Sequence, residues 1–190
     1  MLGLTVPLFD GYEDIFKRAM ADCTVYGEYG CGASTMWVAK NTSCKIISVD
    51  TSEIWATHVR ESLPCRTDLL IKYVDVGPVK KWGRPESYAN AENFSGYTEY
   101  LWEQADVPDV VLVDGRFRVC CFLTTLARAR EGTVVIFDDY IRRPHYHYVE
   151  RFLKPVEVNG RQAKFILPPL EKRDTERILA SVKKFRYVLD

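Results

Sequence analysis

The stretch CTVYGEYGCGAST, residues 23–35, constrains the fold more than any other part of the sequence. A short run of β-branched and aromatic residues leads into a glycine turn, and the spacing predicts a helix that begins near Ser34. Gly30 and Gly32 allow positive φ and close backbone approach, so we expect a ligand to reach main-chain N–H groups at the positive end of that helix. The pattern predicts a ligand-binding turn between a parallel strand and its helix.

Acidic residues accompany this turn. Glu28 is expected to end the first strand with its carboxylate directed into the same crevice. The next predicted strand, residues 45–49, delivers Asp50 at the spacing at which an acidic side chain meets the ribose hydroxyls in dinucleotide folds. Glycine turns also occur for steric reasons alone, so Asp50 is what favours a nucleotide-like ligand. A nicotinamide fold needs a third glycine where this sequence has Thr35.

Strands and helices are predicted to alternate along the rest of the chain. A helix over residues 10–21 precedes the glycine strand, and Trp55, Val59 and Leu63 mark the apolar stripe of a later helix capped by Thr51 or Ser52. Residues 77–90 are expected to form an irregular excursion in which Trp82 either stacks on a ligand or pins the loop. Further strands are expected over residues 69–74, 110–113 and 133–137, with helices over 94–105 and around 119–126.

The C-terminal part of the chain predicts a hairpin. Residues 156–158 and 162–167 read as strands joined by a type I′ turn at Asn159 and Gly160, and a charged amphipathic helix follows over about 172–185. We therefore predict an α/β fold. It is a Rossmann-like three-layer sandwich with a mostly parallel seven-stranded sheet, a C-terminal antiparallel hairpin and helices on both faces. Residues 1–190 are expected to form a single domain with its core at about 23–167.

The predicted strands share an acidic residue at or near the carboxyl end. Ligands of open parallel sheets bind beyond these ends, and one acid per strand is hard to explain by packing alone. The acids are Glu28, Asp50, Asp75, Asp114 and Asp138.

The motif EYGCGAS, followed by Asp50, resembles the first motif and second-strand acid of class I S-adenosylmethionine-dependent methyltransferases. Five parallel strands followed by a hairpin resemble the layout of the same family. The resemblance implies S-adenosylmethionine as cofactor, with Gly30 and Gly32 facing its amino acid part and Asp50 its ribose. The implied cofactor-binding residues are Glu28, Gly30, Cys31, Gly32, Ser34, Asp50, Thr51, Asp75 and Asp114.

The ends of the fourth and fifth strands carry the residues that could act on a methyl acceptor. A hydroxyl acceptor needs a group that takes its proton, and the candidates are Asp114, Asp138 and Tyr140. Neighbouring arginines either recognise an anionic acceptor or neutralise these acids. These arginines are Arg116, Arg118, Arg142 and Arg143.

These acids also raise the question of a metal. The arrangement resembles the Mg²⁺ site of catechol-type O-methyltransferases, but Asp139 stands where that family tends to have Asn, so Mg²⁺ is possible but not favoured and no metal ligand is assigned.

Composition excludes several classes of partner. The sequence has 26 Lys plus Arg and 26 Asp plus Glu, so no net charge favours nucleic acid or an anionic membrane. It has no basic leader before an apolar segment and no stretch long enough for a membrane span, and its six cysteines form no CxxC pair. We expect a cytoplasmic protein, with a homo-oligomer left open.

The sequence therefore predicts an S-adenosylmethionine-dependent methyltransferase-like protein that modifies a hydroxyl of a small-molecule or saccharide acceptor. Two alternatives stay open at this point. One is an NAD(P)-dependent oxidoreductase, which shares the glycine turn and Asp50. The other is a non-catalytic relative that keeps the fold as a binding module.

Overall fold

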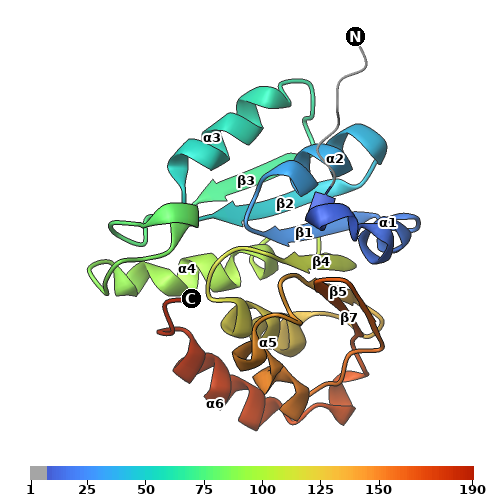
Figure 1. The fold of residues 1–190 in the computed structure, drawn as a ribbon, viewed down its shortest axis with the longest axis vertical. Coiled ribbons are helices and arrows are strands. Elements are labelled where there is room, and N and C mark those ends of the chain that lie inside the picture. The colour runs from blue at the N-terminus through green and yellow to red at the C-terminus, as the bar shows by residue number, and fades with distance from the viewer. Residues whose placement is uncertain (1–7) are drawn as a thin grey trace.

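The structure is a computed structural model that describes residues 8–190. The expectation of no leader segment rests partly on residues 1–7, which lie outside the described residues. A seven-stranded sheet with the order β3-β2-β1-β4-β5-β7-β6 runs through the middle of the molecule (Figure 1). The strands are β1 (Val25–Tyr29), β2 (Lys45–Asp50), β3 (Leu69–Tyr73), β4 (Val110–Val113), β5 (Val134–Phe137), β6 (Glu157–Asn159) and β7 (Gln162–Ile166).

Strands β1 to β5 pair in parallel, and β7 is antiparallel to both β5 and β6. All four residues of β4 are buried, as expected for a central strand covered on both faces. The predicted mostly parallel sheet with a C-terminal hairpin is confirmed. This order also separates the fold from a nicotinamide Rossmann domain, whose strand order is 3-2-1-4-5-6 without the antiparallel hairpin.

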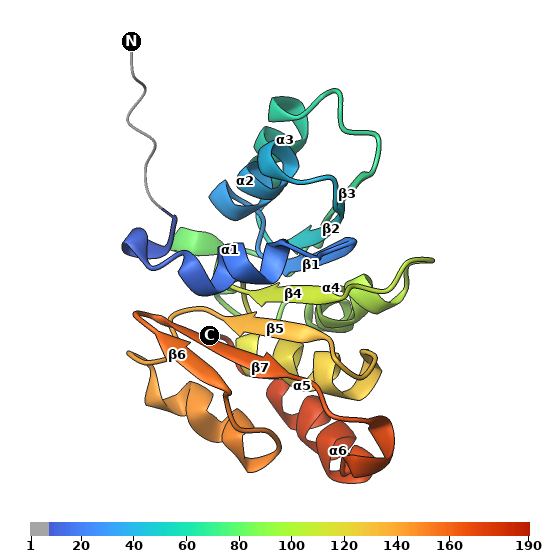
Figure 2. The ribbon, with the colours of Figure 1, turned by 90° about the vertical axis from the view of Figure 1, so that its right-hand side faces the viewer.

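Helices cover both faces of the sheet (Figure 2). They are α1 (Asp14–Met20), α2 (Ala33–Asn41), α3 (Glu53–Ser62), α4 (Phe94–Glu99), α5 (Arg118–Arg128) and α6 (Thr175–Phe185). Short 3-10 helices span Leu8–Gly11, Lys81–Gly83, Ala91–Asn93, Tyr100–Trp102, Pro144–Arg151 and Leu170–Lys172. Within residues 8–190, no helix has both the length and the apolar character that crossing a bilayer requires.

Aromatic side chains fill the core on both faces of the sheet. On the α1 and α2 face, Phe16 packs edge-on against Tyr26 and Trp37. On the α4 and α5 face, Phe122 packs against Phe137 and Phe165. Burial of such a side chain contributes about 1.5–3 kcal/mol, so the two clusters hold the helices to the sheet and keep the strand ends in register.

Three predicted elements differ from the structure. The N-terminal helix, expected over residues 10–21, starts only at Asp14, and Tyr12 is 46% exposed because a 3-10 turn precedes α1. The helix expected over 94–105 tightens into a 3-10 turn at Tyr100. The hairpin connection is Gly160 and Arg161, one residue later than predicted, because Asn159 still pairs with Gln162.

The C-terminal helix α6 packs on α5 rather than on the sheet edge. Ile178 and Val182 are buried in the main core cluster, and the Cys120 thiol lies 3.5 Å from the Val182 carbonyl oxygen. The residues after α6 contact the irregular loop that follows β3. Arg84 donates to the Leu189 carbonyl at 3.0 Å, and the Tyr88 hydroxyl donates to the Tyr187 carbonyl at 3.0 Å. The loop is therefore anchored to the C-terminal segment.

Candidate functional site

A cavity of about 650 Å³ lies beyond the carboxyl ends of β1, β2, β4 and β5. This is the edge at which open parallel sheets bind their ligands. The cavity is lined by Asp10, Gly30, Cys31, Gly32, Ala33, Asp50, Ser52, Trp55, Trp82, Asp114, Gly115, Arg116, Arg118, Asp139, Arg143 and Arg161.

The two glycines of the β1 turn serve different purposes. Gly30 has φ +94°, and a Cβ on it would lie 2.6 Å from the Cα of Gly115, so the approach of β1 and β4 requires glycine here. Gly32 has φ 172°, which is extended backbone, so it does not use the left-handed conformation that glycine allows. A Cβ on Gly32 would meet nothing within 4 Å. No contact among the described residues requires glycine at this position. The absence of a side chain leaves open space in the cavity wall.

Asp50 ends β2 at the cavity and also braces the glycine turn. One carboxylate oxygen accepts from the Cys31 N–H at 2.9 Å, and the other accepts from the Ser52 N–H at 2.7 Å. Each carboxylate oxygen has two acceptor positions, so one position on each oxygen remains for a ligand. Burial raises the pKa of Asp50 above its usual value, although the two backbone donors oppose that shift.

Glu28 does not reach the cavity, and the prediction that it points into the crevice is wrong. Its side chain is completely buried and accepts hydrogen bonds from the hydroxyls of Ser34 and Thr35 at the start of α2. Those bonds also turn the Ser34 hydroxyl away from a ligand. Burial raises the pKa of Glu28 to about 7. Glu28 therefore fixes the helix that presents the turn.

This burial gives a prediction for stability against pH. The pKa of Glu28 is about 7 in the folded protein and 4.5 as its ordinary value, so the folded state holds the proton more tightly. The resulting stability is fully present below about pH 4.5 and is lost as the pH rises to about 7. Its size is about 3 kcal/mol. Urea unfolding of wild type and Glu28→Gln at pH 5 and pH 8 should give a flatter pH dependence for the variant, and equal slopes would contradict the assignment.

Arg118 and Arg161 organise the acids beyond β4 and β5. Arg118 is buried, pairs with Asp114 at 3.1 Å and Asp139 at 3.3 Å, and also donates to carbonyl oxygens of both strand ends. Arg161, from the hairpin turn, donates to the completely buried Asp138 at 3.0 Å and pairs with Asp139 at 2.7 Å. Arg118 thus links the ends of the two strands, and few of its hydrogen-bond donors remain for a substrate.

The acid cluster has the residue types of a metal site. Carboxylate oxygens of Asp114, Asp138 and Asp139 lie within 4.8 Å of one another, as a divalent ion would require. Each carboxylate, however, already has a guanidinium partner from Arg118 or Arg161. These residues therefore do not fit Mg²⁺ as they are arranged. Burial and the neighbouring Asp114 raise the pKa of Asp138 to about 8, so the cluster also retains a proton at neutral pH.

The cavity brings together only part of the predicted site. Thr51 donates its hydroxyl to the Gly83 carbonyl at 2.7 Å, and Tyr140 is buried with its hydroxyl donated to Glu150 at 2.9 Å. Asp75 is exposed and accepts from the Gly77 N–H, and Arg142 is exposed outside the cavity. The predicted residues that do line it are Gly30, Cys31, Gly32, Asp50, Asp114, Arg116, Arg118 and Arg143, and those that do not are Glu28, Ser34, Thr51, Asp75, Asp138, Tyr140 and Arg142.

Sequence reasoning missed other residues of the cavity wall. Trp55, assigned to a buried stripe, is 44% exposed and lies at the cavity. Trp82, for which stacking on a ligand was one of two predicted roles, also lines the cavity and is 69% exposed. Asp10 and Arg161 form an ion pair at 2.9 Å on the side of the cavity beyond β5. The Arg161 position follows the hairpin signal by one residue and could have been found from it, whereas nothing in the sequence marks Asp10.

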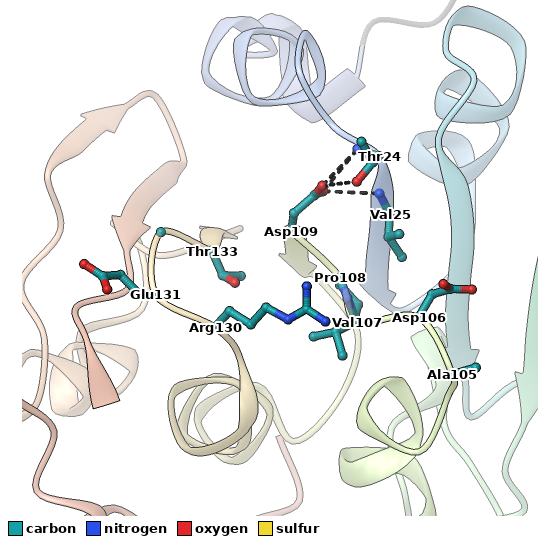
Figure 3. A pocket seen from close by; sticks show the side chains of 11 residues that line it. Thr24, Val25, Ala105, Asp106, Val107, Pro108, Asp109, Arg130, Glu131 and Thr133 are labelled. Carbon is teal, nitrogen blue, oxygen red and sulfur yellow. Dashed lines mark hydrogen bonds between the residues drawn. The ribbon is translucent and has the colours of Figure 1, made fainter. Parts of the chain in front are cut away.

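A second cavity, of about 480 Å³, lies at the amino ends of the strands (Figure 3). Its Asp109 accepts from the backbone N–H groups of Thr24 and Val25, so this carboxylate joins the starts of two strands. Arg130 extends along its floor toward Pro108. Because Asp109 accepts hydrogen bonds from the backbone of β1 and the residue before it, its role here is structural. This cavity is not the candidate functional site.

The sheet order and the glycine turn with its acid define a Rossmann-like fold of the class I methyltransferase type. Comparison with solved structures gives the same class. A methyltransferase-like protein from Silicibacter pomeroyi is similar over 96% of both chains, with 31% identity and a TM-score of 0.83. No family model matches the sequence. No curated protein matches it either. On the strength of the similar structure, the chain belongs to the class I methyltransferase superfamily.

More distant structures share the fold. The N-methyltransferase NodS from Bradyrhizobium japonicum WM9, in complex with S-adenosyl-L-homocysteine, is 12% identical with a TM-score of 0.59 over 87% of this chain and 90% of its own. MycE, a methyltransferase of the mycinamycin biosynthetic pathway in complex with Mg and SAH, is 16% identical with a TM-score of 0.50 over 90% of this chain and 51% of its own.

Proposed function

We propose that the protein is an S-adenosylmethionine-dependent methyltransferase that modifies a hydroxyl group of a small-molecule or saccharide acceptor. The observation that carries the proposal is the bare Gly32 beside Asp50 in a cavity at the carboxyl ends of the strands. A backbone surface without side chains admits the amino acid part of the cofactor, and the free acceptor positions of Asp50 suit two ribose hydroxyls. The complexes of NodS and MycE with S-adenosylhomocysteine support this choice of cofactor.

Different residues have different roles along the cavity. Cys31 and Ser52 hold the Asp50 carboxylate in place through their N–H groups, so ligand binding needs no rearrangement of that acid. The exposed indoles of Trp55 and Trp82 offer flat apolar surfaces near this end. The cofactor, when bound, supplies an activated methyl group.

Asp114 is the residue we assign to the acceptor. It is partly exposed, lines the cavity and lies one residue before Gly115, which touches the glycine turn. Burial raises its pKa above the ordinary value, which makes it a better acceptor for the proton of a hydroxyl. Arg118 holds its carboxylate in a fixed position. A carboxylate of this kind favours oxygen as the acceptor atom, because a hydroxyl must lose its proton during the transfer.

Titration calorimetry with S-adenosylhomocysteine and with NADH tests the proposal. We expect the first to bind at micromolar concentrations and the second to show no saturable binding, because the strand order and the hairpin differ from the nicotinamide fold. Tight binding of NADH alone would overturn the proposal. Binding of S-adenosylhomocysteine without methyl transfer to any member of a panel of alcohols, phenols and sugars would instead support a non-catalytic binding module.

A further inference from the structure

The cavity contains four arginines, and three of them are paired with acids. Arg118 pairs with Asp114 and Asp139, Arg143 pairs with Asp139 at 2.9 Å, and Arg161 pairs with Asp10 at 2.9 Å. The fourth is Arg116. Its guanidinium forms no ion pair and no hydrogen bond with any residue in the described range 8–190.

Arg116 is also held in place and partly desolvated. Its backbone N–H donates to the Tyr97 hydroxyl at 3.0 Å, and its Nε is buried without an acceptor in the described part of the chain. A buried donor without a partner is unfavourable, and more so when the group is charged. Burial and the neighbouring Arg118 lower the pKa of Arg116, so this position disfavours the cation unless an anion joins it.

Two acids near this guanidinium accept hydrogen bonds from backbone N–H groups instead of pairing with it. Asp50 uses an acceptor position on each oxygen for backbone N–H groups, and Asp190 accepts from the Arg118 N–H at 3.3 Å. Their charges act on Arg116 without forming an ion pair. The wall of the cavity thus contains a positioned guanidinium whose donors have no partner in the described part of the chain.

We propose that Arg116 is the anion-binding residue of this cavity and takes a carboxylate or phosphate group of a bound ligand. A guanidinium suits both groups because its donors match their oxygens in pairs. The inference rests on the proposed function for the identity of that ligand. The anion has two possible sources, the carboxylate of the cofactor's amino acid part and an anionic group on the acceptor.

Arg116→Gln removes the charge and keeps a similar length, and Arg116→Lys keeps the charge but not the paired donors. Arg130→Gln is the matched control, because Arg130 is exposed at the opposite edge of the sheet and forms no ion pair in the described structure (Figure 3). Thermal melting of each protein with inorganic phosphate at constant ionic strength reports anion binding through stabilisation of the folded state. We expect phosphate to stabilise wild type and Arg130→Gln equally and Arg116→Lys less. Arg116→Gln should need at least tenfold more phosphate than wild type for the same stabilisation.

Calorimetry identifies the source of the anion. If the cofactor supplies it, wild type prefers S-adenosylhomocysteine over its decarboxylated analogue at least tenfold, and Arg116→Gln loses that preference. If the acceptor supplies it, Arg116→Gln binds S-adenosylhomocysteine as wild type does, and the phosphate effect persists in the protein saturated with S-adenosylhomocysteine. Equal behaviour of Arg116→Gln and wild type in all of these titrations overturns the inference. Phosphate titration of the protein alone separates failure of this inference from failure of the proposed cofactor.

Discussion

Gly32→Ala is expected to reduce affinity for S-adenosylhomocysteine at least a hundredfold while changing the free energy of unfolding by no more than about 1 kcal/mol. The added methyl group meets no atom of the described chain within 4 Å, and the backbone there is extended, so the fold tolerates it. The methyl group instead occupies the space in which a ligand would contact the backbone. Calorimetry and urea unfolding of the same preparation measure the two effects.

Gly30→Ala is the contrasting variant for this experiment. Its Cβ would lie 2.6 Å from the Cα of Gly115, and its φ of +94° disfavours any side chain. We expect a loss of roughly 2–4 kcal/mol of stability, because neither backbone segment can move without separating β1 from β4. If Gly32→Ala retains full affinity, the open space beside it does not hold the ligand.

Asp50→Asn is expected to reduce affinity for S-adenosylhomocysteine about a hundredfold. A carboxylate accepts from both ribose hydroxyls, and hydrogen bonds to a charged group contribute about 1.5–3 kcal/mol each. The amide has only one accepting oxygen, which must also serve the Cys31 and Ser52 N–H groups. We therefore expect a stability loss of about 1 kcal/mol as well, measured by urea unfolding.

A modified ligand distinguishes loss of the ribose contact from disturbance of the glycine turn in Asp50→Asn. Wild type should bind the 2′-deoxy analogue of S-adenosylhomocysteine at least tenfold more weakly than the parent compound, and Asp50→Asn should bind the two with similar affinity. If the variant discriminates as strongly as wild type, the ribose does not contact Asp50. The loss of affinity would then come from disturbance of the glycine turn alone.

The sequence was sufficient to predict the features that depend on local pattern. Alternating strands and helices, the glycine turn and the C-terminal hairpin follow from periodicity and turn residues within a few positions. The position of Asp50 at the cavity follows in the same way, because it is the last residue of β2. These features need no knowledge of which distant segments meet.

The orientation of Glu28 could not be predicted because it depends on where the strand ends. β1 continues to Tyr29, so Glu28 lies within the sheet and faces the start of α2 instead of the cavity. Trp55 was misassigned for a related reason. It fits the helical spacing of Val59, but it lies in the first turn of α3, and this turn lines the cavity.

The partners of the acids beyond β5 depend on tertiary pairing. β7 is antiparallel to β5, with Phe137 opposite Ala163, and this register carries the hairpin turn over the end of β5. Arg161 reaches Asp138 only for that reason. A sequence pattern that extends over a few residues contains no information about such a contact.

The ion pair of Asp10 with Arg161 has a consequence for how the protein is assembled. These residues are 151 positions apart in the chain, whereas the wall that includes Gly30, Asp50 and Trp82 comes from one continuous portion of the N-terminal half. During synthesis that portion emerges well before Arg161, and closing so long a loop carries a larger entropic cost. The side of the cavity that holds this ion pair is therefore expected to be the last part of the cavity to form and the first to open under mild denaturation.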